Sequence, residues 1–253
     1  MIIAVANQKG GVAKSTTAIN LSAGLALAGH KVLLIDTDPQ NNSSLVFTHP
    51  EMEIELEKTL HNALINFAPI ATVTRQTRVD NLFVVPSHLR LSSLDLELAQ
   101  AFDNRSERLK RALGDLPQQY DYIIIDNPPA LGLLTINSLV ACDRLLIPVS
   151  SGLFALTGLV QLQETMGMIR QTQLNPDLDI LGVLHTKTDH TNVSKDVDRQ
   201  LREHFGELVF ETAIPRNVSL EEAHSRYTHI FDYAPNSTGA QAYKALAQEV
   251  AER

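Results

Sequence analysis

The chain has 253 residues, of which 44% are hydrophobic and 20% are charged, and these proportions are typical of a globular fold and exclude wholesale disorder. Lys and Arg total 21, Asp and Glu total 29, and the net charge is −8, so any contact with nucleic acid must use a local patch. The single cysteine, Cys142, excludes an internal disulfide and a multi-cysteine metal centre within one chain. We expect neither a signal peptide nor a membrane span, because the apolar runs are short.

Short apolar runs alternate with amphipathic segments along the whole sequence. The runs are mostly β-branched and continuously apolar, which predicts strands buried on both faces at residues 2–6, 32–35, 82–85, 123–125, 145–149 and 180–184. Periodicity near 3.6 predicts helices at residues 16–28, 95–113, 153–171, 194–205 and 239–251. We therefore expect an α/β fold over residues 1–253, a single domain whose doubly wound, mostly parallel sheet carries helices on both faces. Gly29 is placed to cap the first helix.

A phosphate-binding loop is predicted between the first strand and the first helix. The octamer is Lys9-Gly10-Gly11-Val12-Ala13-Lys14-Ser15-Thr16. Its glycines let backbone N–H groups converge on phosphate oxygens, and the start of the helix adds a favourable dipole. Lys14 can reach the β- and γ-phosphates, Ser15 can ligate Mg²⁺, and Thr16 can bind the α-phosphate.

This octamer departs from the common pattern G-x-x-x-x-G-K-[ST], because Gln8 and Ala13 stand at the two glycine positions. If position 13 needs a positive φ, alanine costs roughly 1–2 kcal/mol of strain. If position 13 is right-handed, the cost is small and entry into the helix improves. Both conformations remain open from the sequence.

Two carboxylate motifs follow predicted strands, Asp36-Thr37-Asp38-Pro39-Gln40 and Asp126-Asn127-Pro128-Pro129. The C-terminal ends of parallel strands face the ligand crevice of such a sheet. We expect Asp126 to act on Mg²⁺ through a bound water, and Asp38 to hold the water that attacks the nucleotide.

With these motifs in place, the chain resembles the ParA/MinD family of deviant Walker-type ATPases, closest to its short ParA-type members. The resemblance covers the whole length and rests on the front lysine Lys9, the D-x-D-P-Q and I-I-D-x-P-P motifs, and the tail segments 214–223 and 236–243. It implies a P-loop NTPase fold, ATP and Mg²⁺ as cofactors, and an ATP-dependent sandwich dimer in which Lys9 reaches the partner's phosphates. It also implies nucleotide contacts at Gln40, Pro215 and Asn217.

Three branches of this family can be compared with the sequence. Cys142 stands alone, so an iron–sulfur carrier is not expected and a small buried side chain is. The C-terminal segment carries one apolar stripe, formed by Tyr243, Leu246, Ala247 and Val250. A stripe of this size predicts a helix that packs on the chain's own domain rather than one that binds a membrane surface. The short ParA proteins bind duplex DNA without sequence preference.

Basic residues are the candidates for that DNA contact. In the last third of the chain they are Lys187, Lys195, Arg199, Arg202, Arg216 and Arg226, and a second cluster is Arg105, Arg108, Lys110 and Arg111. His190 and Ser219 stand where the family resemblance predicts arginines. This difference weakens the prediction that the first group of basic residues contacts DNA.

The resemblance implies a cytoplasmic, nucleoid-associated ATPase that positions a cargo through an adaptor that stimulates hydrolysis. The cargo could be a plasmid or chromosome origin, with a ParB-like adaptor, or a carboxysome, with an McdB-like adaptor. Two alternatives remain open: a MinD-like regulator at a membrane surface, and a nucleotide-dependent interaction module that does not hydrolyse ATP.

Overall fold

An eight-stranded sheet forms the centre of the molecule, in the order β3-β4-β2-β5-β1-β6-β7-β8. The computed structural model describes residues 1–48, 54–99, 104–114, 116–152 and 157–253. The strands are β1 (Ile2–Val5), β2 (Val32–Asp36), β3 (Arg75–Gln76), β4 (Leu82–Val85), β5 (Tyr122–Asp126), β6 (Arg144–Ser150), β7 (Asp179–Thr188) and β8 (Ile214–Pro215). Every neighbouring pair is parallel except β3 with β4.

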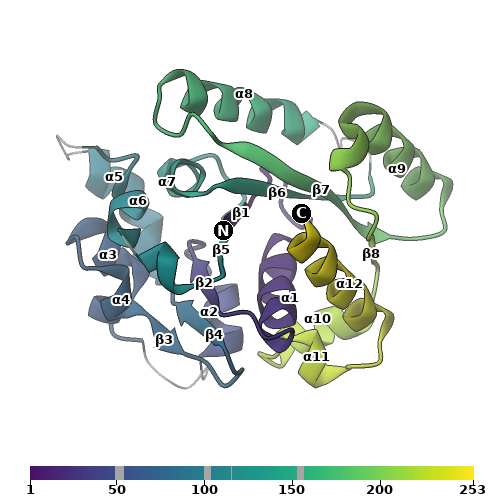
Figure 1. Cartoon of the computed structure of the whole chain (residues 1–253), viewed down its shortest axis with the longest axis horizontal. Coiled ribbons are helices and arrows are strands. Elements are labelled where there is room, and N and C mark those ends of the chain that lie inside the picture. Colours follow the sequence, from purple (N-terminus) through teal and green to yellow (C-terminus); the bar gives the residue numbers. More distant parts are fainter. Residues whose placement is uncertain (49–53, 100–103, 115, 153–156) are drawn as a thin grey trace.

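Helices cover both faces of this sheet (Figure 1). They are α1 (Lys14–Leu27), α2 (Asn42–Phe47), α3 (Leu60–Ile65), α4 (Ile70–Val73), α5 (Leu94–Ala99), α6 (Arg108–Leu113), α7 (Leu133–Ala141), α8 (Thr157–Gln171), α9 (Asn192–Phe205), α10 (Val218–Ser225), α11 (Ile230–Tyr233) and α12 (Thr238–Glu252). Short 3₁₀ turns lie at Leu56–Lys58, Leu89–Ser93, Leu116–Gln119 and Gly206–Leu208.

Successive strand residues enter two different cores. Ile2 and Ala4 of β1 pack with residues of α3, α7 and α8, whereas Ile3 and Val5 pack with residues of α1 and α12. Because successive side chains of a strand point to opposite faces, a strand covered on both faces must be apolar throughout. The predicted doubly wound sheet is confirmed.

The first helix ends as its sequence predicts. Gly29 has a φ of 97° and its N–H donates to the carbonyl of Ala26, while the N–H of His30 donates to the carbonyl of Leu25. This pair of hydrogen bonds is a Schellman cap, in which glycine supplies the left-handed residue.

One predicted helix was wrong. The segment 95–113 does not form a single helix: α5 ends at Ala99, and α6 begins only at Arg108. Asn137 of α7 explains the later start, because its amide donates to the carbonyl of Arg105 at 2.9 Å and accepts from the N–H of Leu109 at 3.1 Å. A side chain from a distant helix therefore takes the polar groups that a continuous helix would have paired internally.

Of the predicted helix 153–171, residues 153–156 lie outside the described residues.

The two edge strands were not predicted. Both β3 and β8 have only two residues, which is too short for a hydrophobic period to be recognised. Strand β7 is also longer than the apolar run 180–184, since it extends to Thr188 beside β8.

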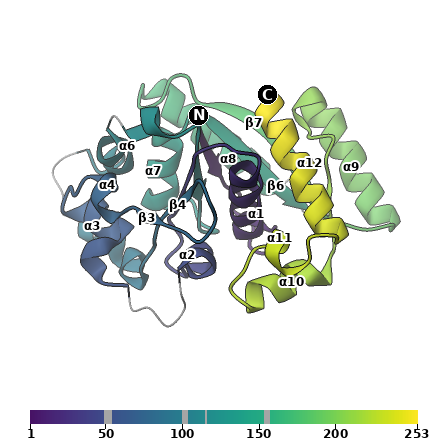
Figure 2. The same cartoon turned by 60° about the horizontal axis from the view of Figure 1, so that its bottom comes forward.

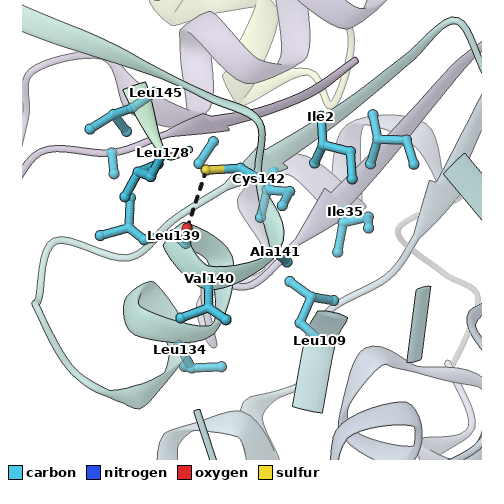
Figure 3. Close-up of a cluster of buried hydrophobic side chains, with 14 of the residues drawn as sticks. Ile2, Ile35, Leu109, Leu134, Leu139, Val140, Ala141, Cys142, Leu145 and Leu178 are labelled. Atoms are coloured by element: carbon cyan, nitrogen blue, oxygen red, sulfur yellow. Dashed lines mark hydrogen bonds between the residues drawn. The ribbon is translucent and has the colours of Figure 1, made fainter. Parts of the chain in front are cut away.

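Cys142 lies in the core between β1, α7 and β6 (Figure 3). Its side chain is buried, and its thiol lies 3.7 Å from the carbonyl oxygen of Leu139. Burial raises the pKa of Cys142 to about 12. The expected small buried residue is confirmed.

The C-terminal helix α12 packs along α1 (Figure 2). Its stripe Tyr243, Leu246, Ala247 and Val250 is buried in the core on that face, and the Tyr243 hydroxyl lies 3.2 Å from that of Thr17. The expected packing of the stripe on the chain's own domain is confirmed. Among the described residues, no helix combines the length and apolarity that crossing a membrane requires.

Candidate nucleotide site

A cavity of about 430 Å³ opens beside the start of α1, where the loops after several parallel strands meet. The phosphate loop, α2 and the segment from β8 into α10 form its walls. The sequence-predicted residues that line it are Gly10, Gly11, Ala13, Lys14, Ser15, Thr16, Asp38, Pro215, Arg216 and Asn217. The fold thus brings residues from both ends of the chain to one site.

Two left-handed residues shape the phosphate loop. Gly11 has a φ of 73° and Ala13 a φ of 66°, so the question that the sequence left open about position 13 is answered, and the alanine is strained. The carbonyl of Ala13 accepts the N–H of Thr17 and begins α1. Val12 is buried, and its carbonyl accepts a hydrogen bond from the Thr186 hydroxyl of β7 at 3.1 Å.

Lys14 is held at the cavity by the backbone of its own loop. Its side chain is buried, and Nζ donates to the carbonyl of Lys9 at 3.0 Å. Burial lowers the pKa of Lys14, and the carboxylates of Asp126 and Asp38 raise it in part. A partly desolvated ammonium group with few protein partners is suited to a phosphate, because a ligand anion would replace the lost hydration.

Asp126 is fully buried and does not itself line the cavity, but its carboxylate interacts electrostatically with Lys14, which does. It ends β5 and lies opposite Val5 on one side and Asp36 on the other. The Ser43 hydroxyl donates to Oδ2, whereas Oδ1 is buried with no hydrogen-bond partner among the described residues. Burial raises the pKa of Asp126. An unpaired buried acceptor of this kind fits a water molecule of a hydrated Mg²⁺ ion, with Ser15 at the cavity wall as a direct ligand.

Asp38 lies on the cavity wall, near the start of the loop that joins β2 to α2. Its Oδ1 accepts the N–H of Gln40 at 2.9 Å, while Oδ2 has no hydrogen bond to the described residues. Gln40 itself does not line the cavity, and its backbone rather than its side chain serves the site.

The opposite wall is suited to a nucleoside. Pro215 ends β8, Asn217 precedes α10, and the Asn217 amide donates to the Thr238 hydroxyl at 2.8 Å. The sequence analysis did not assign Lys187 to this site, yet Lys187 lines it from a bulge in β7 with a φ of 52°. The register shift between β7 and β8 is what places Lys187 at the cavity, and the sequence around Lys187 does not predict that shift.

Lys9 differs from the other loop residues. It is not among the residues that line the cavity, and a Cβ placed on Gly152 would lie 3.7 Å from Lys9 Nζ. Its N–H donates to the Asn7 side chain at 3.0 Å. The backbone of Lys9 is therefore part of the loop, whereas its side chain lies outside the cavity, beside Gly152.

The predicted DNA-contact residues do not form one free cationic face. Arg199 lies 3.3 Å from both Asp196 and Glu203, and Arg202 pairs with Asp198 at 3.3 Å and with Glu211 at 2.9 Å. For Lys195 and Arg216, no carboxylate of the described residues lies within ion-pair distance.

In the second basic cluster, Arg108 is buried, with its guanidinium 4.0 Å from the centre of the Phe67 ring. Lys110 donates to the carbonyl of Leu174 at 3.1 Å. Arg105 and Arg111 are exposed. Arg108 therefore packs as a core residue and is not available to contact DNA.

A parallel sheet that sets a lysine-bearing phosphate loop opposite strand-end aspartates is the architecture of a P-loop nucleoside triphosphatase. Residues 1–180 match a family described as AAA domain. With the relatives described next, this match shows that the chain belongs to the ParA/MinD family of P-loop ATPases.

Known proteins resemble the chain over nearly its whole length. The sporulation initiation inhibitor protein Soj of Bacillus subtilis is 45% identical, over 99% of this chain and 98% of its own. The chromosome partitioning protein ParA of Myxococcus xanthus is 44% identical, over 100% of this chain and 88% of its own. Among solved structures, cobyrinic acid a,c-diamide synthase from Mycobacterium smegmatis with bound ATP analogue and magnesium is 32% identical, with a TM-score of 0.83 over 98% of this chain and 92% of that one.

Proposed function

We propose that this protein is a partition ATPase that uses ATP to switch between a monomer and a DNA-binding dimer. The observation that carries the proposal is the cavity in which Lys14, Ser15 and Asp38 meet. Similarity to Soj and ParA proteins over the whole chain supports the partition role.

Each residue of the cavity has a separate task in this proposal. The phosphate loop binds the β- and γ-phosphates, with Lys14 balancing their charge. Mg²⁺, when bound, neutralises charge that develops on the phosphates; Ser15 would hold it directly, and Asp126 would orient one of its waters. Asp38 would orient the attacking water through its free Oδ2, and Pro215 and Asn217 would flank the base.

The position of Lys9 supports a dimer in which two sites face each other. Its side chain leaves its own cavity, so the ammonium group is available to the phosphates of a second copy. We propose that ATP joins the two copies because each phosphate group is then shared between two lysines, and that hydrolysis removes this link.

The dimer would bind duplex DNA of the nucleoid without sequence preference, through Lys195 of α9 and Arg216, which follows β8. A ParB-like or McdB-like adaptor on the cargo would stimulate hydrolysis and release the protein from DNA. The MinD-like alternative, in which α12 binds a membrane surface, is less favoured because the apolar stripe of α12 is buried against α1.

Asp38→Ala tests the proposal. Loss of the water-orienting carboxylate should lower the hydrolysis rate by about 10²–10⁴-fold, while phosphate contacts remain. Phosphate release measures the rate, and light scattering with ATP and Mg²⁺ measures the dimer, which should persist for longer than in the wild type. Hydrolysis at the wild-type rate would contradict the role of Asp38.

A further inference from the structure

We infer that Ser87, acting with Ser44, is a positioning residue that fixes Asp38 for hydrolysis. The inference rests on the role of Asp38 in the proposed function. Ser87 follows β4, far from the phosphate loop in sequence, and neither serine lines the nucleotide cavity. The Ser87 hydroxyl contacts Asp38 directly, whereas the Ser44 hydroxyl contacts Ser87 and Asp36.

The first contact is on the backbone of Asp38. The Ser87 hydroxyl donates to the carbonyl oxygen of Asp38 at 2.6 Å, and the N–H of Asn41 donates to the same oxygen at 2.9 Å. The N–H of Asp38 donates to Oδ1 of Asp36 at 3.1 Å. Both polar groups of the Asp38 backbone are therefore held, so the direction of its side chain is set by the protein and not by the ligand.

The second contact links Ser87 to Asp36 through Ser44. The Ser44 hydroxyl accepts the N–H of Ser87 at 2.8 Å and donates to Oδ2 of Asp36 at 2.7 Å. The N–H of Ser44 donates to the same carboxylate oxygen at 2.8 Å. The chain of hydrogen bonds thus closes into a ring, Asp38–Ser87–Ser44–Asp36–Asp38.

Burial makes this ring rigid. Asp36 and Ser44 are 0% exposed and Ser87 is 1% exposed. Buried polar groups that satisfy one another resist rearrangement, because any broken bond leaves a desolvated donor or acceptor. A catalytic carboxylate requires such support, since a displacement of about 1 Å can cost about 10²-fold in rate.

The test compares Ser87→Ala with Ser138→Ala in the full chain. Ser138 of α7 is also 0% exposed, and its hydroxyl also donates to a backbone carbonyl, that of Leu134 at 3.0 Å. Both variants lose one buried hydroxyl, but only Ser87→Ala breaks the ring. The measurements are single-turnover ATP hydrolysis with Mg²⁺, the dissociation constant of a fluorescent non-hydrolysable ATP analogue, and the melting temperature.

For Ser87→Ala we expect the hydrolysis rate to fall about 10-fold, which corresponds to the loss of one buried hydrogen bond of about 1.4 kcal/mol. The analogue should bind within about 2-fold of the wild-type affinity, because this hydrogen bond holds Asp38 and not the nucleotide. Ser87→Cys replaces the hydroxyl by a somewhat larger thiol that is a weaker donor, so it should give an intermediate rate, and it serves as the test if the alanine variant does not fold. Ser138→Ala should hydrolyse ATP at the wild-type rate.

The double variant Asp38→Ala with Ser87→Ala separates this inference from the proposed function. If positioning acts through Asp38, Ser87→Ala has no further effect once Asp38 is gone. A wild-type rate in Ser87→Ala, or an equal loss with and without Asp38, overturns the positioning role alone. A wild-type rate in Asp38→Ala overturns the role of Asp38 in the proposed function and the positioning role with it.

Discussion

At the residue scale, Ala13 is the position at which this phosphate loop carries strain. Its φ of 66° and ψ of 34° are left-handed, a conformation that glycine adopts freely and alanine does not. Two hydrogen bonds hold the loop around this residue: Lys14 Nζ donates to the carbonyl of Lys9, and the N–H of Thr17 donates to the carbonyl of Ala13.

Ala13→Gly should therefore stabilise the nucleotide-free protein. Relief of roughly 1–2 kcal/mol of strain is offset in part by the greater freedom of glycine in the unfolded chain, about 0.5–1 kcal/mol, which leaves a gain of about 0.5–1 kcal/mol. Urea denaturation measures it, with Ala28→Gly as the control because Ala28 is right-handed at φ −79°. A loss of stability in both variants would show that position 13 is not left-handed in solution.

His185 provides a second prediction at this scale. It is 2% exposed, and burial lowers its pKa although Asp198 raises it in part. The unfolded chain takes up a proton as the pH falls through about 6.5, and the folded chain does not. The unfolding free energy should thus decrease on acidification below about pH 6.5.

His185→Gln removes this contribution while His224 and His229, whose pKa values are also lowered by burial, remain in place. Between pH 7.5 and 5.5 the variant should lose less stability than the wild type, by at most about 1 kcal/mol. Urea denaturation at both pH values provides the comparison. An identical pH dependence in the two proteins would mean that His185 binds its proton equally in the folded and unfolded states.

At the scale of elements, ion pairing divides the predicted cationic residues. Arg199 and Arg202 of α9 each pair with two carboxylates, and a phosphate would have to displace those partners. Lys195 lies in the first turns of the same helix, and Arg216 follows β8, where its N–H donates to the carbonyl of Thr188.

Reversal of Lys195 and Arg216 to Glu should therefore weaken DNA binding more than reversal of Arg199 and Arg202. A dimer loses four phosphate contacts in the first case, so the slope of log affinity against log salt should become shallower by about 3 to 4. Binding of ATP-loaded protein to a fluorescent duplex at several salt concentrations measures both effects. Equal losses in the two variants would show that Arg199 and Arg202 contact DNA as well.

The pair Arg105→Glu and Arg111→Glu is the matched control for that experiment. It makes the same change in net charge on exposed residues in and just before α6, instead of on α9 and after β8. An equal loss of affinity in this control would show that the effect comes from net charge and not from a defined patch.

Elements that depend on local sequence were predictable, and elements that depend on distant partners were not. The buried strands and long helices follow from hydrophobic period alone. The break before α6 depends on Asn137, and β3 and β8 exist because neighbouring strands offer free hydrogen-bonding groups. The same holds at the site: the phosphate loop is one contiguous motif, whereas only the fold brings Lys187 to the cavity and Ser87 to the backbone of Asp38.

At the scale of the whole molecule, the proposed ATP-dependent switch doubles the molar mass, because a monomer becomes a dimer. ATP with Mg²⁺ should convert monomer to dimer in light scattering, and Lys14→Ala should abolish the change because it removes the nearest phosphate partner. Lys9→Ala should still bind a fluorescent ATP analogue but remain monomeric, because the Lys9 side chain leaves its own cavity. A Lys9→Ala protein that dimerises with ATP as the wild type does would contradict the shared site.

The two-residue edge strands also limit how copies of this protein can polymerise. A long, flat sheet edge exposes a row of unpaired N–H and C=O groups that can recruit a strand from another chain, which is the first step toward fibres. In the described sheet, β3 and β8 close the two sides with two residues each. High local concentrations, such as those on a crowded DNA lattice, should therefore favour reversible side-chain contacts between copies over irreversible strand-by-strand aggregation.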